Sequence, residues 1–142
     1  MECEFPTINS NMQEVKEIFE SVKTIAVLGL SPDETKASHR VAKYLKEEGY
    51  LIVPVYPKEE TILGEKVYRS LAEIPFPVDM VNIFRKPVVL EAIADAAIKR
   101  GDVKVFWAQK DIVNNAAAQK AKDAGMRVVQ NQCAMVDHKN LK

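Results

Sequence analysis

A short loop near the start of the chain carries the residues best suited to bind an anion. The apolar run Thr24–Leu28 ends at Gly29, and two serines follow, Ser31 in the loop and Ser38 near the start of a predicted helix. A helix N-terminus presents unpaired backbone N–H groups and the positive end of the helix dipole, which favour phosphate. Alternatively, the serines only satisfy local backbone donors. The residues assigned to this candidate site are Gly29, Leu30, Ser31, Pro32, Ser38, His39 and Arg40.

The end of the second predicted strand indicates which kind of phosphate compound would bind. Tyr56-Pro57-Lys58 stands where an NAD site normally has an acidic residue for the ribose diol. Lys58 suits a phosphorylated ribose, either CoA with its 3′-phosphate or NADP with its 2′-phosphate, and Arg40 and Arg85 can add positive charge. The G-x-G-x-x-G and G-x-x-x-x-G-K-S/T phosphate loops are absent. Alternatively, Lys58 is a solvated lysine that begins a charged run.

The cysteines and histidines show no catalytic or metal-binding spacing. His39 and His138 have no evident nucleophile partner, and Cys3 and Cys133 do not form a C-x₂₋₄-C pair. We therefore assign no catalytic residue, no metal site and no disulfide framework. Cys133 follows the fifth predicted strand and is either a buried structural cysteine or a thiol close to the ligand.

Apolar runs and amphipathic segments alternate along the chain and must position these residues. Strands are predicted at 24–28, 51–55, 78–84, 103–107 and 126–129. Helices are predicted at 12–22, capped by Ser10 or Asn11, and at 38–48, 88–100 and 114–124. Residues 58–77 are an irregular crossover, and the tail from Met135 is left unassigned.

This alternation predicts an α/β fold, namely a Rossmann-like doubly wound five-stranded parallel sheet with helices on both faces. The predicted strand order is 3-2-1-4-5. Residues 1–142 are expected to form a single domain, with the helix of residues 1–22 packed on it. Ligands of such sheets bind at the carboxyl ends of the strands where the order reverses, here strands one and four.

Composition narrows the class of protein. The 142 residues are 47% hydrophobic and 28% charged, as in ordinary globular proteins. Twenty Lys and Arg balance twenty Asp and Glu and are spread along the chain, so no nucleic-acid footprint is predicted. Apolar runs fall far short of the roughly 18 residues of a membrane span, and the acidic start Met1–Glu4 lacks the basic region of a signal peptide. We predict a cytoplasmic protein without a membrane partner.

Seven short motifs resemble, in the same order, those of small bacterial and archaeal CoA-binding proteins. The resemblance extends from about Lys23 to His138. These proteins are similar to the N-terminal CoA-binding domain of the succinyl-CoA synthetase α subunit, which implies CoA binding without a complete ligase. The motifs are Ile25–Pro32, Ser38–Ala42, Val53–Lys58, Ile62–Tyr68, Val81–Arg85, Trp107–Gln109 and Val113-Asn114.

The resemblance assigns a part of CoA to each loop. It implies that the diphosphate is held by Gly29, Ser31, Ser38 and Arg40. The adenine and 3′-phosphoribose would be flanked by Val55, Tyr56, Pro57 and Lys58, and the other side of the site would be bordered by Phe84 and Arg85. Cys133 would lie near the pantetheine end. Three positions depart from the family pattern. The family commonly has Asn at Tyr56, Gly at Asp111 and Asp-Arg at Asn131-Gln132, and the last two departures concern the thiol end.

The sequence thus predicts a module that binds CoA or acyl-CoA without catalysis of its own. Two alternatives stay open: an NADP-dependent reductase fragment, and a non-catalytic subunit that completes an acyl-CoA ligase in trans. A reductase needs a further region with an acid or base, for which the predicted sheet leaves little room. The trans subunit requires a large exposed apolar patch. Small-molecule CoA is the predicted partner, and a protein partner is left open.

Overall fold

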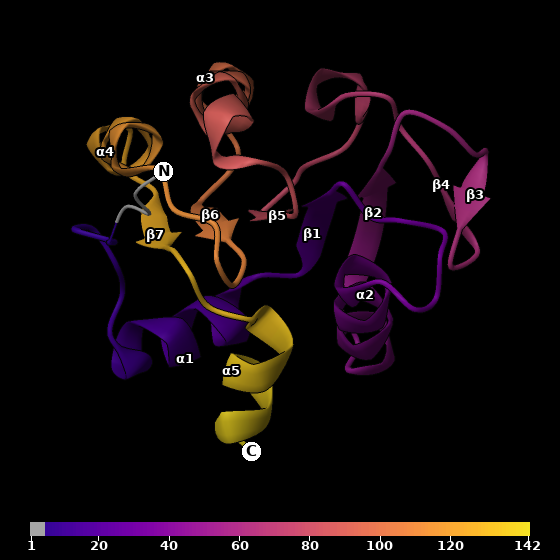
Figure 1. The fold of residues 1–142 in the computed structure, drawn as a ribbon, viewed down its shortest axis with the longest axis horizontal. Helices are drawn as coiled ribbons and strands as arrows, with labels where there is room; N and C mark the ends of the chain where they lie inside the picture. Colours follow the sequence, from indigo (N-terminus) through magenta and orange to yellow (C-terminus); the bar gives the residue numbers. More distant parts are fainter. Residues whose placement is uncertain (1–4) are drawn as a thin grey trace.

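A parallel β-sheet crosses the middle of the molecule (Figure 1). The computed structural model describes residues 5–142. The strands are β1 (Thr24–Leu28), β2 (Leu51–Val55), β5 (Met80–Ile83), β6 (Val105–Ala108) and β7 (Arg127–Val129). They lie in the order β2-β1-β5-β6-β7, and all neighbours are parallel. The predicted five-stranded parallel sheet is confirmed, and its burial on both faces explains the continuous apolar runs.

The strand order differs from the predicted 3-2-1-4-5. The third of these five strands along the chain, β5, pairs with β1 rather than β2, so the order is 2-1-3-4-5. Between β2 and β5 the chain forms a hairpin of β3 (Thr61–Ile62) and β4 (Glu65–Lys66) and the 3₁₀ helix η1 (Leu71–Glu73). Pro54 supplies a physical reason, because a proline in a central strand would lack a donor for the ladder, and β2 is an edge strand here.

Helices cover both faces of the sheet (Figure 1). One face carries α1 (Met12–Ser21), α2 (Ala37–Glu47) and α5 (Ala134–Asn140), and the other carries η1, η2 (Pro87–Val89), α3 (Leu90–Arg100) and α4 (Asn115–Asp123). Two separate hydrophobic cores result, one on each side of the sheet. The doubly wound architecture is therefore confirmed. Helix α5 lies in the tail that the sequence left unassigned.

Capping residues set several of the predicted helix ends. Asn11 begins α1 with a capping box shared with Glu14, and Asn114 accepts from the Ala117 N–H at the start of α4. Gly101 ends α3 in the left-handed conformation, at φ +82°. Helix α2 begins at Ala37, one residue before the predicted start, and its N-cap residue makes no side-chain capping bond.

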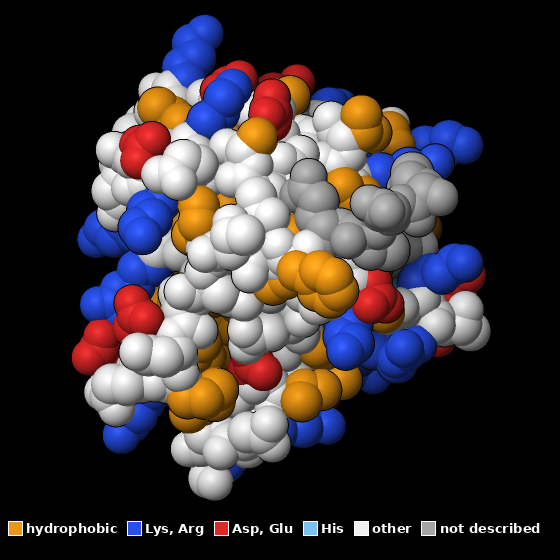
Figure 2. Space-filling model, turned by 60° about the vertical axis from the view of Figure 1, so that its left-hand side comes forward, with side chains coloured by type: hydrophobic (Ala, Val, Ile, Leu, Met, Phe, Trp, Pro, Cys, Tyr) orange, Lys and Arg blue, Asp and Glu red, His pale blue; other side chains and the backbone are white. Residues whose placement is uncertain are grey.

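Both edge strands are closed by polar contacts. Beside β2, Tyr68 donates its N–H to the Pro54 carbonyl (3.0 Å) and accepts from the Tyr56 N–H (3.1 Å). Beside β7, the Asn9 side chain accepts from the Gln130 N–H (3.0 Å) and donates to the Gln130 carbonyl (3.1 Å). The N-terminal segment thus follows the β7 edge. Figure 2 looks onto this side of the molecule, where hydrophobic side chains form separate groups among polar and charged ones.

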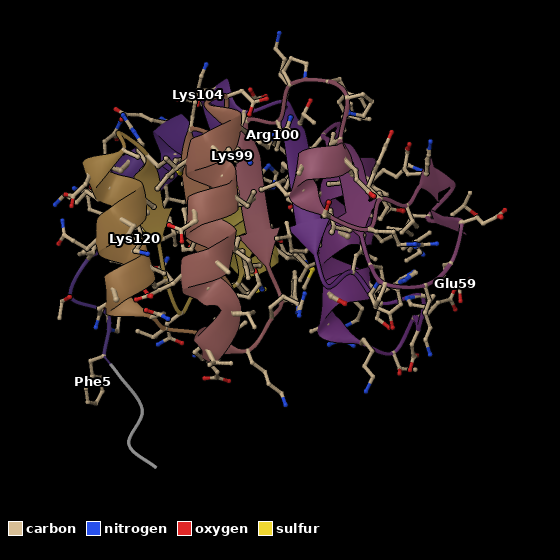
Figure 3. All side chains as sticks on the ribbon, turned by 90° about the horizontal axis from the view of Figure 1, so that it is seen from above. Phe5, Glu59, Lys99, Arg100, Lys104 and Lys120 are labelled. Carbon is tan, nitrogen blue, oxygen red and sulfur yellow. The ribbon has the colours of Figure 1, made fainter. Side chains whose placement is uncertain are left out.

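Arg100 fixes the crossover between β2 and β5. Its guanidinium donates to three backbone carbonyls and to the Asp102 carboxylate, at 2.8–3.1 Å. The carbonyls belong to Leu71, Ile74 and Phe76. Figure 3 shows Arg100 at the end of the sheet where the strands begin, near Lys99 and Lys104. None of the helices within residues 5–142 is long and apolar enough to cross a membrane.

Candidate functional site

The carboxyl ends of β1, β2 and β5 enclose a cleft. Its volume is about 370 Å³, and its lining residues are Gly29, Val55, Tyr56, Pro57, Arg69, Phe84 and Arg85. The chain leaves β1 for α2 on one face of the sheet and leaves β5 for α3 on the other, so the strand order reverses between these two strands. The predicted reversal between strands one and four is corrected accordingly, because β5 occupies the place beside β1.

Gly29 permits the close approach of the loops that follow β1 and β5. Its φ is +86°, and a Cβ placed on it would lie 2.6 Å from the Phe84 carbonyl oxygen and 3.1 Å from Cδ of Arg85. Only glycine fits both the dihedral angle and the contact. The floor of the cleft therefore consists of bare backbone at this point.

The loop after β1 is held together by its own serines. Ser38 Oγ accepts from the Ser31 N–H (3.0 Å), Ser31 Oγ accepts from the Asp33 N–H (3.1 Å), and Nδ1 of His39 donates to the Ser31 carbonyl (2.9 Å). These contacts match the alternative in which the serines satisfy local donors. Each serine hydroxyl still keeps a proton that it can donate. Arg40 is exposed and donates to the Thr35 carbonyl.

Leu30 and Pro32, also predicted for this loop, differ in exposure. Leu30 is fully buried in the core beneath α2, whereas Pro32 is exposed. Neither lines the cleft. Of the loop residues assigned from sequence, the structure brings only Gly29 into the cleft wall.

The cation on the β2 side of the cleft is Arg69 rather than Lys58. Lys58 is exposed and does not line the cleft, whereas Val55, Tyr56 and Pro57 do. Nη1 of Arg69 donates to the Tyr56 carbonyl (3.0 Å) and to the Lys58 carbonyl (2.8 Å). Sequence reasoning missed Arg69, which directly follows the last residue of a motif, Tyr68. The parallel bridge between Val55 and Tyr68 brings it to the cleft.

A second cavity adjoins the cleft on the α3 side of the sheet. Its volume is about 300 Å³, and its lining residues are Leu28, Val55, Arg69, Ser70, Leu71, Arg85, Val89, Ala92, Ile93 and Ala96. Most of the lining is aliphatic, and the cavity shares Val55, Arg69 and Arg85 with the cleft. The guanidinium groups of Arg69 and Arg85 thus lie on the wall between the cleft and the largely apolar cavity. Within residues 5–142, the side chain of Arg85 has no hydrogen-bond or ion-pair partner.

Cys133 lines neither cavity. It is half-buried at the N-cap of α5, next to Ala134, whose N–H donates to Oε1 of Gln109 (2.9 Å). Asp111, one of the departures from the family pattern, is exposed with φ +70° and also lies outside both cavities. Its N–H donates to Oδ1 of Asn131 (2.7 Å), which joins the loops after β6 and β7.

The site has the chemistry of an anion receptor. Arg69 and Arg85 supply always-charged donors with the fork geometry that suits phosphate. Among the described residues, no group of three or more His, Cys, Asp or Glu is arranged to hold a metal ion. His138 lies on α5 and is absent from both cavity walls. Cys3 lies outside the described residues.

Comparison with known proteins identifies the family. A family model described as a CoA binding domain matches residues 23–139. The chain belongs to this family of CoA-binding domains. The resemblance predicted from the seven motifs is thereby confirmed, over nearly the predicted range.

Two relatives of similar length match nearly the whole of this chain. The uncharacterized protein YneT of Bacillus subtilis is 41% identical over 130 residues, which span 92% of this chain and 96% of that protein. The solved structure of a hypothetical protein from Pyrococcus horikoshii OT3 is 38% identical with a TM-score of 0.90, and the match covers 99% of both chains.

The chain is also similar to a part of several ADP-forming acetate–CoA ligases. The α subunit of acetate–CoA ligase [ADP-forming] II from Pyrococcus furiosus is 42% identical over 66 residues. These residues are 46% of this chain but 14% of the ligase subunit. The CoA-binding domain thus matches a small part of the larger enzyme.

Proposed function

We propose that this protein binds CoA or acyl-CoA in the cleft at the ends of β1, β2 and β5 and performs no catalysis of its own. The observation that carries the proposal is the pair Arg69 and Arg85 on the wall that the cleft shares with the apolar cavity. CoA joins an aromatic base to a phosphorylated ribose and a diphosphate, so its nucleotide end needs adjoining apolar and cationic sites. Membership of the CoA-binding family supports the same ligand.

The shape of the site suggests how the nucleotide end would lie. The adenine would enter the aliphatic cavity, where burial of its ring face is favourable. The 3′-phosphate would face Arg69, with Lys58 reaching inward from the exposed rim. The diphosphate would lie beside Gly29, which has no side chain of its own, and would extend toward the serine hydroxyls and the N-terminus of α2. The pantetheine arm would then extend toward Cys133.

This arrangement predicts that the protein discriminates CoA from dephospho-CoA. We expect dephospho-CoA to bind more weakly by about 1–3 kcal/mol, the range of a charge-assisted hydrogen bond. Arg69→Ala should erase most of that difference, and Lys58→Ala should reduce it less because Lys58 is exposed. Isothermal titration calorimetry of the three proteins with both ligands measures these effects.

Two controls complete the titration. NAD and NADP should bind more weakly than CoA, because the loop after β1 lacks the dinucleotide glycines. Tighter binding of NADP would replace the proposal by the reductase alternative. Lys66→Ala, an exposed lysine outside the cleft lining, should leave all affinities unchanged. An unaltered preference for CoA in both Arg69→Ala and Lys58→Ala would disprove the placement of the 3′-phosphate.

A further inference from the structure

His138 lies in an aromatic box outside the proposed CoA site. Its ring centroid lies 5.1 Å from that of Phe19 on α1, 5.4 Å from that of Tyr44 on α2 and 5.8 Å from that of Tyr50. The Tyr44 hydroxyl hydrogen-bonds with Nδ1 of His138 at 2.7 Å. Only 14% of the imidazole side chain is exposed. One titratable ring therefore connects α5 to both of its neighbouring helices, as Figure 1 shows for the placement of α5 between α1 and α2.

The charged groups around this ring give little support to a protonated imidazole. Glu48, the C-cap residue of α2, lies 3.9 Å from Nδ1, but its carboxylate already pairs with Lys142 at 2.6 Å. Lys139 and Lys142 both lie over the Tyr44 ring, so positive charge is already gathered here. Burial lowers the pKa of His138; Glu48 opposes this effect and Lys142 adds to it. The docked ring therefore takes up a proton less readily than an imidazole in water does.

Two residues near the N-terminus of α5, Cys133 and Trp107, are probes of whether the helix is docked. The Ala134 N–H donates to Gln109, and Nε1 of Trp107 donates to the Gln132 carbonyl at 2.8 Å. Cys133 lies between these two anchors and packs against the same core as Trp107. Trp107 is fully buried and is the single tryptophan of the chain. Undocking of α5 would change the surroundings of one thiol and one fluorophore.

We propose that α5 is a pH-sensitive clamp. Protonation of His138 weakens the docking of α5 on α1 and α2 and thereby exposes the thiol of Cys133. The sign follows from linkage. Undocked His138 takes up a proton as the pH falls below its ordinary pKa of about 6.5, whereas docked His138, with its lowered pKa, does not. The contribution of His138 to docking is therefore fully present above pH 6.5, and it is lost as the pH falls from there toward the lowered pKa. The proposal does not depend on CoA binding.

A second group on α5 titrates in the opposite direction. Asp137 is buried, which raises the pKa of its carboxyl, although a hydrogen bond from Gln132 opposes the rise. Protonation of Asp137 thus favours docking as the pH falls from its raised pKa to its ordinary one. Asp137→Asn removes this contribution and keeps an oxygen that accepts from Gln132. In Asp137→Asn, the docking of α5 should therefore weaken more steeply as the pH falls, because the opposing titration of Asp137 is absent.

The test measures the reactivity of Cys133 in a Cys3→Ser background from pH 7.5 to 5.5. A pyridyl disulfide reagent, which reacts down to acid pH, gives a rate that is divided by the rate of a cysteine peptide at the same pH. We expect this ratio to rise as the pH falls, by about tenfold for each unit between the docked and undocked pKa values of His138. The Trp107 emission should shift to the red in parallel. Amide exchange in β1 and β5 should stay protected, which excludes global unfolding.

The variant His138→Gln separates the clamp from a purely structural role. Without the titrating ring, its reactivity ratio should be the same at every pH, even if α5 docks less firmly throughout. His138→Phe keeps an aromatic ring in the box and should also give a flat ratio. A flat ratio in the protein with His138 would overturn the proposal. So would a rise of equal size in His138→Gln.

Discussion

Gly29 couples the geometry of the cleft to the stability of the fold. In Gly29→Ala the new methyl group meets the Phe84 carbonyl at 2.6 Å, and the residue must also hold a φ of +86°. We expect a loss of about 2–3 kcal/mol in the free energy of unfolding and a loss of CoA affinity, because Phe84 and Arg85 must move. Urea denaturation and calorimetry measure the two effects.

Gly125 provides a matched control for this substitution. Its φ is +93°, but no atom beyond its own chain neighbours lies within 4 Å of the position where a Cβ would stand. Gly125→Ala should therefore cost only the backbone strain, about 1–2 kcal/mol, and leave CoA binding unchanged. Equal effects of Gly29→Ala and Gly125→Ala on both measurements would show that the contact with Phe84 contributes nothing.

Asp111 holds a backbone conformation that glycine adopts more easily. Its φ is +70°, and its side chain is exposed. We expect Asp111→Gly to raise the free energy of unfolding by about 0.5–1 kcal/mol, because relief of strain outweighs the greater entropy of the unfolded chain. Asp111→Ala keeps the strain and removes the same charge, so it should give no gain. Thermal denaturation of both variants distinguishes the backbone effect from the charge effect.

At the scale of elements, the crossover between β2 and β5 depends on the side chain of Arg100. Arg100→Met removes the donors to three carbonyls and leaves the Asp102 carboxylate without its guanidinium partner. We expect a loss of about 2–4 kcal/mol in the free energy of unfolding, because the arginine side chain is only 12% exposed. Lys99→Met on the same helix is exposed and should change little. Guanidinium denaturation measures both.

The Arg100 cluster also predicts a pH dependence. Burial alone would raise the pKa of the Asp102 carboxyl, but hydrogen bonds from Arg100 and from the Val78 N–H outweigh it and hold the pKa below its usual value. The resulting stabilisation is complete above the unfolded pKa of about 3.9 and is lost as the pH falls through the lower folded value. Arg100→Met should therefore lose less stability than the parent protein between pH 5 and pH 2.

The same elements show what the sequence could and could not predict. Asn11, Asn114 and Gly101 set helix ends through local chemistry, so those ends were predictable. Helix α5 was not, because Cys133 makes no side-chain capping bond and the helix depends on distant partners such as Tyr44. The proline in β2 indicates an edge strand, whereas the predicted Rossmann order 3-2-1-4-5 places this strand between two others.

At the scale of the whole molecule, the site follows from the topology. The cleft lies where the chain departs to opposite faces of the sheet, and loops from three strands meet there. This explains why Gly29, Val55–Pro57 and Phe84–Arg85 were predictable as one group, since each follows or ends a strand. Arg69 was not predictable, because it reaches the cleft through a single bridge between Val55 and Tyr68.

The contact between Asn9 and Gln130 has a consequence for the behaviour of the protein at high concentration. The Asn9 side chain is a primary amide that both donates to and accepts from one residue beside β7, as the peptide group of a neighbouring strand would. A strand from another molecule would have to displace this amide before it could pair there. With a proline in the opposite edge strand, both borders of the sheet are poorer templates for fibril growth than uninterrupted open strands would be.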